Sequence, residues 1–404
     1  MGKAKTPSVK HVTTLQLERW RRYAAPVLEA ANPMKFVRKA LRAGGYGGDL
    51  RPALLTYLAV TSRLLAMRSG MMPAHLLLVG QPSSGKSYTM RAVQRLLPSS
   101  AYHLIEAGSS RVVIYENADL RHRALFFGEA DSLPAGEDNP AASAIRNLLQ
   151  DNELHYKVSI RDPRKGGYRV RHIKKRGPTV LITTSTRRLG EQLESRLFCV
   201  DMREDHRQVR KALRMQARLE SKPAPKRSKP LVAYQAYLQA LAPWVVCVPY
   251  ADKLAEVIGR SPAESRVVRD FSRLLALIKA AAVLRHRHRR KNAKGQLVAT
   301  RSDYKLVYKL VREVYKASAS GAGDRVRAVV DTVTTLQRAA GKKPITETMV
   351  ANHLKTSKMA VSRHVQRALA GGWLVNDDPR PRRYDLRIGE PLPDERGLPR
   401  PETL

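Results

Sequence analysis

The stretch that decides the fold is Leu76-Leu77-Leu78-Val79-Gly80-Gln81-Pro82-Ser83-Ser84-Gly85-Lys86-Ser87. Its first four residues form an apolar run that predicts a buried strand, and the apolar residues that follow it, Met90, Val93 and Leu97, recur at helical spacing. The eight residues in between fit the pattern G-x-x-x-x-G-K-[ST] in the strand–loop–helix setting that this pattern requires. We therefore expect backbone N–H groups of the loop to surround phosphate oxygens at the start of a helix.

This phosphate-binding loop, residues 80–87, predicts ATP and Mg²⁺ as ligands. All eight residues are expected to contact the nucleotide: Gly80, Gln81, Pro82, Ser83, Ser84, Gly85, Lys86 and Ser87. The Lys86 ammonium is expected to reach the β- and γ-phosphates, and the Ser87 hydroxyl to ligate Mg²⁺. The alternative is an ordinary glycine turn between a strand and a helix.

A site that hydrolyses ATP in this way needs a second strand that ends in carboxylates. The best candidate is residues 124–131, Ala-Leu-Phe-Phe-Gly-Glu-Ala-Asp, in which Glu129 is the expected general base. Gly128 stands where an Asp would support the metal, so Asp131 is the candidate metal ligand, although it could equally cap the next helix. The departure at Gly128 leaves open a site that binds ATP but turns it over poorly.

Two further residues complete the predicted catalytic group. Residues 179–186 are an apolar strand that ends in four hydroxyl side chains, and Thr184 is the candidate for orienting the attacking water, with a simple strand-end turn as the alternative. Arg196 lies at the edge of the apolar run that follows, in Ser195-Arg196-Leu197-Phe198. We expect Arg196 to enter the nucleotide site of a neighbouring subunit. The alternative is a surface arginine in an ion pair.

The rest of the chain divides by changes of pattern. Apolar runs at Leu76–Val79, Val112–Tyr115, 125–127 and 180–183 alternate with helical segments, which predicts an α/β fold with a parallel sheet. We expect Asp49, with Pro52 just inside, to begin a helix. The expected organisation is an N-terminal helical segment (1–50), an α/β core (51–215), a helical lid (230–316), a small C-terminal domain (320–390) and a disordered tail (391–404).

The charge of the chain points to nucleic acid. Its 404 residues include 74 Lys and Arg against 35 Asp and Glu, which gives a formal net charge of +39. Such a surplus opposes compaction unless an anion is bound. The sequence contains no apolar run near the roughly 20 residues of a membrane helix. The two cysteines are too few for a disulfide framework, so a cytoplasmic protein without a membrane partner is expected.

Residues 153–176 predict a basic β-hairpin. Alternating apolar and polar residues lie on both sides of a turn at 161–167, and Tyr156 and Tyr168 are interleaved with the basic residues. The expected DNA contacts are Lys157, Arg161, Arg164, Lys165, Arg169 and Arg171. The alternative is a solvated edge hairpin that is kept basic to resist aggregation.

The C-terminal segment predicts a winged helix. A helix at 324–339 precedes a helix–turn–helix pattern at 346–354 and Lys358–Ala370, and two short strands flank the loop 376–383. The expected DNA contacts are Lys358, Ser362 and Arg363 on the second helix of the motif and Arg380, Arg382 and Arg383 in the wing. A protein-interaction module is the alternative. The run Arg285-His286-Arg287-His288-Arg289-Arg290-Lys291 is a further phosphate-binding candidate, with a solvated helix end as its alternative.

Taken in order, the phosphate loop, the strand with Glu129, the polar strand, Ser195-Arg196-Leu197-Phe198 and a helical lid resemble the AAA+ superfamily of P-loop ATPases over residues 51–290. The hairpin resembles the one inserted before the polar strand in the branch of minichromosome-maintenance and mobile-element helicases. The resemblance implies a ring-shaped homo-oligomer, most simply a hexamer, with ATP sites between subunits. It also implies that a lid arginine, Arg269 in preference to Arg266 or Arg273, contacts the γ-phosphate.

Together these features predict a DNA-dependent AAA+ ATPase of DNA replication, a helicase or helicase-like initiator, for which a primase is a candidate partner. The alternative is an ATP-dependent DNA-binding switch that loads or regulates another machine without unwinding. A transcription activator of this superfamily is disfavoured because its G-A-F-T-G-A-like loop is missing. A metabolic kinase would explain neither the charge nor the winged helix.

Overall fold

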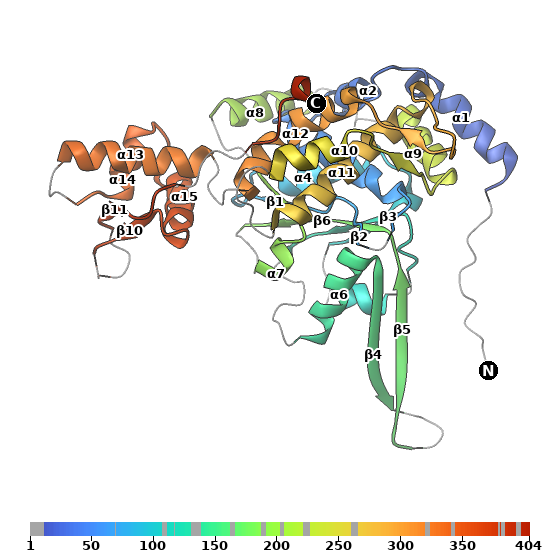
Figure 1. Cartoon of the computed structure of the whole chain (residues 1–404), viewed down its shortest axis with the longest axis horizontal. Coiled ribbons are helices and arrows are strands. Elements are labelled where there is room, and N and C mark those ends of the chain that lie inside the picture. The colour runs from blue at the N-terminus through green and yellow to red at the C-terminus, as the bar shows by residue number, and fades with distance from the viewer. Residues whose placement is uncertain are drawn as a thin grey trace. The chain divides into compact units, whose positions relative to one another are not determined.

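A five-stranded parallel sheet forms the centre of the protein in this computed structural model, and helices lie on both of its faces (Figure 1). The expected α/β fold with a parallel sheet is confirmed. The structure describes residues 12–68, 70–106, 111–116, 118–130, 139–161, 166–186, 191–202, 206–220, 227–259, 266–319, 324–340, 344–378, 380, 384–392 and 397–404.

The order of the strands brings the ends of three of them together. The sheet contains β1 (Leu76–Val79), β2 (Tyr102–Ile105), β3 (Arg123–Phe127), β6 (Thr179–Ser185) and β7 (Phe198–Asp201), in the order β2-β3-β6-β1-β7. Because β6 lies between β3 and β1, the carboxyl ends of β1, β3 and β6 are neighbours. In open parallel sheets, ligands bind at this edge, where the chain switches direction across the sheet.

Both faces of the sheet are buried, as parallel sheets require. The helices α3 (Leu50–Thr61) and α4 (Lys86–Gln94) cover one face. The other face packs against α5 (Val112–Tyr115) and α6 (Pro140–Asp151), where Leu77 and Val79 share a core with Leu148 and Leu149. The four residues of β1 are therefore all buried, and the phosphate loop begins from a rigid strand.

From Pro52 to Thr61 every residue of the helix α3 is buried, as its mostly apolar sequence favours. The Asp49 side chain accepts a hydrogen bond from the Arg51 backbone N–H, which confirms the helix start predicted at Asp49. Further along, the fully buried Arg63 donates to the Val60 carbonyl and to the side chains of Gln235 and Gln239. These hydrogen bonds tie the segment before the sheet to α9 (Lys229–Ala240).

The N-terminal helices belong to the same compact unit as the sheet. This first unit comprises residues 1–256, 268–310 and 401–404. Its remaining elements are α1 (Thr14–Leu28), α2 (Met34–Ala43), α7 (Glu191–Glu194), α8 (His206–Glu220), β8 (Val246–Cys247), α10 (Ala251–Gly259), α11 (Arg266–Leu284), β9 (Leu297–Val298) and α12 (Arg301–Ala319), with α10 and α12 continuing into the second unit. Because α1 packs along α9, the segments 1–50 and 230–310 form one body with the sheet rather than separate parts.

Besides parts of α10, α11 and α12, the described residues of the second unit (257–267 and 311–400) form three whole helices and a small antiparallel ribbon. These are α13 (Asp324–Ala340), α14 (Glu347–His353), α15 (Lys358–Ala370), β10 (Leu374–Asn376) and β11 (Leu386–Ile388). Val350, Val361 and Val365 are buried in the core of this unit, and the partly buried Leu354 and Leu369 pack against it. The helix–turn–helix elements and the two strands thus lie where the pattern predicts them.

Two expectations about the elements need correction. Val112–Tyr115 was expected to be a strand but forms α5, because Val113 and Ile114 bury against the helix-covered core while β2, which the sequence did not reveal, pairs with β3. A short apolar run cannot by itself distinguish a strand from a buried turn of helix. The tail was expected to be disordered, yet residues 397–404 end in a 3₁₀ turn, Pro401–Thr403, with Leu398 and Leu404 buried.

Within the described ranges, no helix combines the length and the apolar character that crossing a membrane would require.

Candidate functional site

The phosphate loop, residues 80–87, is held open by backbone geometry. Gly85 has φ +86°, a left-handed conformation that favours glycine, and it caps the first turn of α4. Ser83 also adopts a positive φ, 66°. The positive φ angles of Ser83 and Gly85 turn the chain between the end of β1 and the start of α4.

The side chain of Lys86 fills the centre of this loop. Its ammonium group is nearly buried and donates to the carbonyl oxygens of Gly80 at 2.7 Å and Gln81 at 2.8 Å. A cation in the middle of a glycine-containing loop at a helix N-terminus is the arrangement that binds phosphate. The contact of Lys86 with the β- and γ-phosphates stays a prediction, and it would start from this position.

The remaining loop residues suit a phosphate ligand. Ser84 has a buried hydroxyl for which the described residues supply no hydrogen-bond partner, and a Cβ at Gly85 would meet open space. Ser87, the candidate Mg²⁺ ligand, is exposed at the start of α4, as are Pro82 and Ser83. The donor set therefore fits a nucleotide phosphate with its metal ion.

The strand β3 brings Glu129 to the same edge of the sheet. Phe127 pairs with Thr183, so Glu129 and Thr184 follow neighbouring strand ends. The Thr184 hydroxyl donates to the Gly128 carbonyl, which fixes the backbone that carries the exposed Glu129. Thr184 is itself buried, so its hydroxyl positions the turn that precedes Glu129.

The structure supplies a steric reason for Gly128. A Cβ at this position would lie 2.6 Å from the carbonyl oxygen of Glu106, and the Gly128 N–H donates to the Ile105 carbonyl at 2.8 Å. The end of β2 thus passes directly against Gly128. An aspartate at position 128 would require this backbone to move, so the departure from the expected carboxylate is a consequence of packing.

Two carboxylates at this edge were missed by the sequence analysis. Asp201 is the last residue of β7 and pairs with Val79, the residue before the phosphate loop. Glu106 follows β2 and lies 3.7 Å from Arg91 on α4. The signal for Asp201 was present, because an acidic residue ends the apolar run that follows Arg196. We call Glu106, Glu129, Asp201 and residues 80–87 the carboxyl edge.

Of the two predicted metal ligands, the structure describes Ser87. Asp131 lies outside the described residues. Within the described part of the chain, no group of three or more His, Cys, Asp or Glu side chains is arranged to hold a metal ion. Ser87, exposed at the start of α4, is the predicted metal ligand that the structure does describe.

Arg196 lies at the opposite edge of the sheet from the phosphate loop. It precedes Phe198, which starts β7 and pairs with Leu76, the first residue of β1. The two sites are thus separated by the length of a four-residue strand, about 13 Å at roughly 3.3 Å per residue. The Arg196 guanidinium donates to the Gln150 side chain at 3.0 Å. Within one chain, Arg196 therefore does not meet residues 80–87.

Arg269, the candidate lid arginine, lies beside Arg196 rather than beside the phosphate loop. It donates to the Ser195 hydroxyl at 2.9 Å. The neighbouring Arg273 is fully buried, pairs with Asp270 at 3.0 Å, donates to the Ser195 carbonyl and lies over the Phe198 ring. The expected contact of Arg269 with a γ-phosphate in its own subunit therefore lacks a geometric basis here, because α11 packs on the segment before β7.

Burial and the neighbouring arginines lower the pKa of Arg196. Burial, and then the charges of Arg269 and Arg146, hold this pKa below its usual value. Three guanidinium groups thus share one region, and an anion placed there would relieve their repulsion. We call Arg146, Arg196, Arg269 and Arg273 the arginine edge.

His75 connects the segment that follows Arg196 to the sheet through its backbone and its ring. Its Nε2 is bonded to the Leu149 carbonyl at 2.8 Å and its Nδ1 accepts from the Leu181 N–H at 3.0 Å, so the ring is neutral with the proton on Nε2. Complete burial lowers the pKa of His75 to about 4. One ring therefore connects α6, β1 and β6 close to the segment that carries Arg196.

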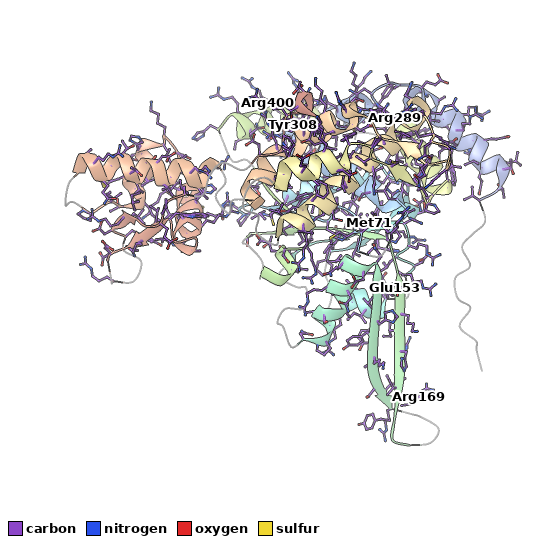
Figure 2. The ribbon with its side chains drawn as sticks, in the orientation of Figure 1. Met71, Glu153, Arg169, Arg289, Tyr308 and Arg400 are labelled. Carbon is purple, nitrogen blue, oxygen red and sulfur yellow. The ribbon has the colours of Figure 1, made fainter. Side chains whose placement is uncertain are left out.

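The predicted hairpin is present as two nine-residue strands, β4 (Glu153–Arg161) and β5 (Tyr168–Arg176), that extend away from the sheet (Figure 1). Figure 2 shows Glu153 at the base of this hairpin and Arg169 near its far end. Leu154 is buried in the core at the base, where Tyr156 contacts Tyr115 edge-on. Towards the far end the hairpin has no such support, and the Tyr168 side chain faces solvent.

The register divides the candidate DNA contacts between the two faces of the hairpin. Arg171 pairs with Val158 and Arg169 with Ile160, whereas Lys157 pairs with His172 and Arg161 with Tyr168. Because directly paired residues share a face and successive residues alternate, Arg169 and Arg171 lie on one face and Lys157 and Arg161 on the other. Arg164 and Lys165 lie outside the described residues.

The second unit exposes part of its predicted DNA-binding set. Lys358 is exposed at the start of α15, where the Ser357 side chain accepts from the Ala360 N–H. Ser362 and Arg363 are half-buried. Arg380 is exposed but held by Asp378 at 2.9 Å, and the hydrogen bond and charge of that carboxylate raise the pKa of Arg380. Arg382 and Arg383 lie outside the described residues.

The basic run 285–291 is not a uniform solvated helix end. Arg285 and Arg289 both bind the buried carboxylate of Asp303, at 3.0 Å and 2.6 Å. Arg287, Arg290 and Lys291 remain exposed. The run is therefore divided into residues that hold the fold and residues that face solvent.

Neither the known protein-family models nor the curated protein sequences include a match to this chain. Its function is accordingly inferred from the geometry of these sites.

Proposed function

We propose that the protein is a DNA-dependent ATPase of the AAA+ type that acts in DNA replication as a helicase or helicase-like initiator, with ATP bound at residues 80–87. The observation that carries the proposal is the loop itself: a buried lysine inside a turn made by left-handed Gly85, at the start of a helix and at the switch point of a parallel sheet.

The residues of the loop would hold the nucleotide through backbone N–H groups, the Lys86 ammonium and the Ser84 hydroxyl. A Mg²⁺ ion bound with it would neutralise phosphate charge. Glu129 would take the proton of the attacking water, and the Thr184 hydroxyl keeps the Glu129 turn in place through the Gly128 carbonyl.

Arg196 and Arg269 support sites shared between copies of the chain. They lie at the edge of the sheet opposite the phosphate loop, so they would act on the nucleotide of a neighbouring copy rather than on their own. A contact between two different edges repeats head to tail, and it closes into a ring if the rotation permits. A hexamer is the ring that we propose.

The hairpin and the second unit would bind DNA. Exposed cations on both faces of the hairpin suit a strand that passes along it, and the basic α15 and wing suit a duplex. The chain's formal net charge of +39 supports a polyanionic partner.

A second candidate is an ATP-dependent DNA-binding switch, a loader or regulator without unwinding activity. The observation that favours it is the close approach of Glu106 to Gly128, which leaves no space for a carboxylate at that position. Slow turnover would suit a switch better than a motor.

The test measures ATP hydrolysis and strand displacement on a forked duplex, with and without single-stranded DNA. The helicase proposal expects DNA-stimulated hydrolysis and displacement, both abolished in Lys86→Ala. Hydrolysis and DNA binding without displacement would favour the switch. If the unaltered protein takes up no ATP in calorimetry at millimolar nucleotide and magnesium, both proposals fail.

A further inference from the structure

A second basic site lies away from the phosphate loop, in a pocket of about 300 Å³ between α2, α3 and α12 of the first unit. Figure 2 labels Arg289 and Tyr308, which lie on the segments next to it. Lys35 and Arg38 come from α2, Lys305 and Lys309 from α12, and Arg285 from the end of α11. None of the residues that line the pocket is acidic.

Four cations at the rim of the pocket lie close enough to repel one another: Lys35, Arg38, Lys305 and Lys309. Lys35 and Arg38 are three residues apart on one helix, and Lys305 and Lys309 are four apart on another, so each pair shares a helix face. Like charges at these spacings destabilise a helix. Within the described residues, Lys35, Arg38 and Lys309 form no ion pair, whereas Lys305 lies 3.6 Å from Glu402 in an exposed pair.

Beneath the rim lies a fifth cation that is only partly neutralised. The Arg285 side chain is 9% exposed and binds Asp303 at 3.0 Å, but Asp303 also binds Arg289. One carboxylate therefore serves two guanidinium groups. The Nε of Arg285 is buried and has no hydrogen-bond partner among the described residues. A buried N–H donor without a partner is costly and points to an acceptor that occupies the pocket.

Asn32, at the start of α2, adds a further polar group. Its Oδ1 atom is buried without a hydrogen-bond partner in the described part of the chain. Because the two ends of an amide side chain are assigned from their partners, rotating this group would place the amide N–H₂ there as a donor. The apolar lining from Met34 and Leu54 limits the water around these groups, which strengthens their interaction with an anion.

We propose that this pocket binds a phosphate group with at least two negative charges, as in pyrophosphate or a terminal phosphate. Two charges or more are needed to balance four rim cations and Arg285, and tetrahedral oxygens can accept from several donors at once. The site contains no residue of the loop 80–87, so the proposal stands whether or not ATP is hydrolysed there. The phosphate could be free or could belong to the end of a nucleic-acid strand.

The experiment uses the full chain with Lys86→Ala, so that the phosphate loop does not obscure the result. Inorganic pyrophosphate is titrated in a calorimeter, and a short 5′-phosphorylated oligonucleotide is compared with its 5′-hydroxyl form. Arg38→Ala combined with Lys309→Ala should weaken binding of the phosphate probe about tenfold or more, since it removes two charge-assisted hydrogen bonds to the anion.

The matched control is Lys39→Ala with Arg301→Ala, which removes the same charge from exposed positions on the same two helices outside the pocket. It should change the affinity less than about twofold. Glu402→Gln should instead tighten binding, because it releases Lys305. Preference for pyrophosphate identifies a free ligand, and preference for the phosphorylated oligonucleotide identifies a strand end. Binding of neither probe, or equal weakening in the pocket and control variants, overturns the proposal.

Discussion

The two edges of the central sheet differ in charge and in how their side chains are held. The carboxyl edge carries Glu106, Glu129 and Asp201 around a loop whose one cation, Lys86, is bound by loop carbonyls. At the arginine edge, Arg269 and Arg273 bind Ser195, and burial together with the charges of Arg269 and Arg146 lowers the pKa of Arg196. The two edges lie at opposite ends of the same strands, so under the proposed function each would present half of a site shared between copies of the chain.

The contrast between the two edges is tested most directly by removing a side chain from the arginine edge. Arg196→Ala should leave nucleotide binding intact and lower the rate of ATP hydrolysis on the order of a thousandfold, the lower range for such an arginine. The measurement is the turnover number, with binding followed by calorimetry. Arg287→Ala, at an exposed position, is the control and should leave turnover unchanged.

A mixture of variants distinguishes shared sites from separate ones. Arg196→Ala copies keep the carboxyl edge and Lys86→Ala copies keep the arginine edge. In an equal mixture, about a quarter of head-to-tail contacts should combine two intact edges and regain activity. If the mixture is as inactive as its components, the two edges do not form a common site.

Lowering the pH should loosen the arginine edge through His75. Its pKa is about 4 in the folded protein against about 6.5 in the unfolded chain, so the unfolded chain takes up the proton first as the pH falls. The stability that neutral His75 contributes is fully present above pH 6.5. It is lost progressively towards pH 4, by roughly 3 kcal/mol.

The measurement is a titration of the His75 ring by NMR together with urea unfolding at several pH values. In His75→Gln the fall in stability between pH 6.5 and 4 should be smaller. A ring that titrates near 6.5 would contradict the buried neutral state.

The close packing at the carboxyl edge is tested by adding the carboxylate that the sequence lacks. Gly128→Asp places a Cβ against the Glu106 carbonyl and should lower the free energy of unfolding by about 1–3 kcal/mol, the usual cost of overpacking. Denaturation in urea measures it. Gly259→Asp, where a Cβ meets open space, is the control. A stable Gly128→Asp protein with faster hydrolysis would show that packing does not explain the glycine.

The smallest expected effect concerns the hairpin, whose cations lie outside both edges. Replacing Lys157, Arg169 and Arg171 by Ala should flatten the dependence of log K on log salt by about 0.9 for each duplex phosphate that the protein no longer neutralises. Comparing Arg169→Ala/Arg171→Ala with Lys157→Ala/Arg161→Ala would show which face binds. An unaltered slope in the triple variant removes the hairpin from the DNA-binding surface.

The features that were predictable share a local signal. The loop 80–87, the helix start at Asp49 and the helix Lys358–Ala370 are each specified by neighbouring residues and lie where expected. The position of Arg269 was not predictable, because it depends on α11 packing against Ser195, which is distant in the sequence. The strand predicted at Val112–Tyr115 was wrong for the same reason, because the distant segment β2 pairs with β3 at the edge of the sheet.

The hydrogen bonds of the Lys86 ammonium bear on how the loop would discriminate between ligands. Its hydrogen bonds to the Gly80 and Gln81 carbonyls hold the ammonium against the first two residues of the loop, so contacts within the folded chain fix the position of this charge. If the loop binds ATP as proposed, the phosphates would compete with these two carbonyls for the ammonium. That competition would favour polyphosphates over singly charged anions.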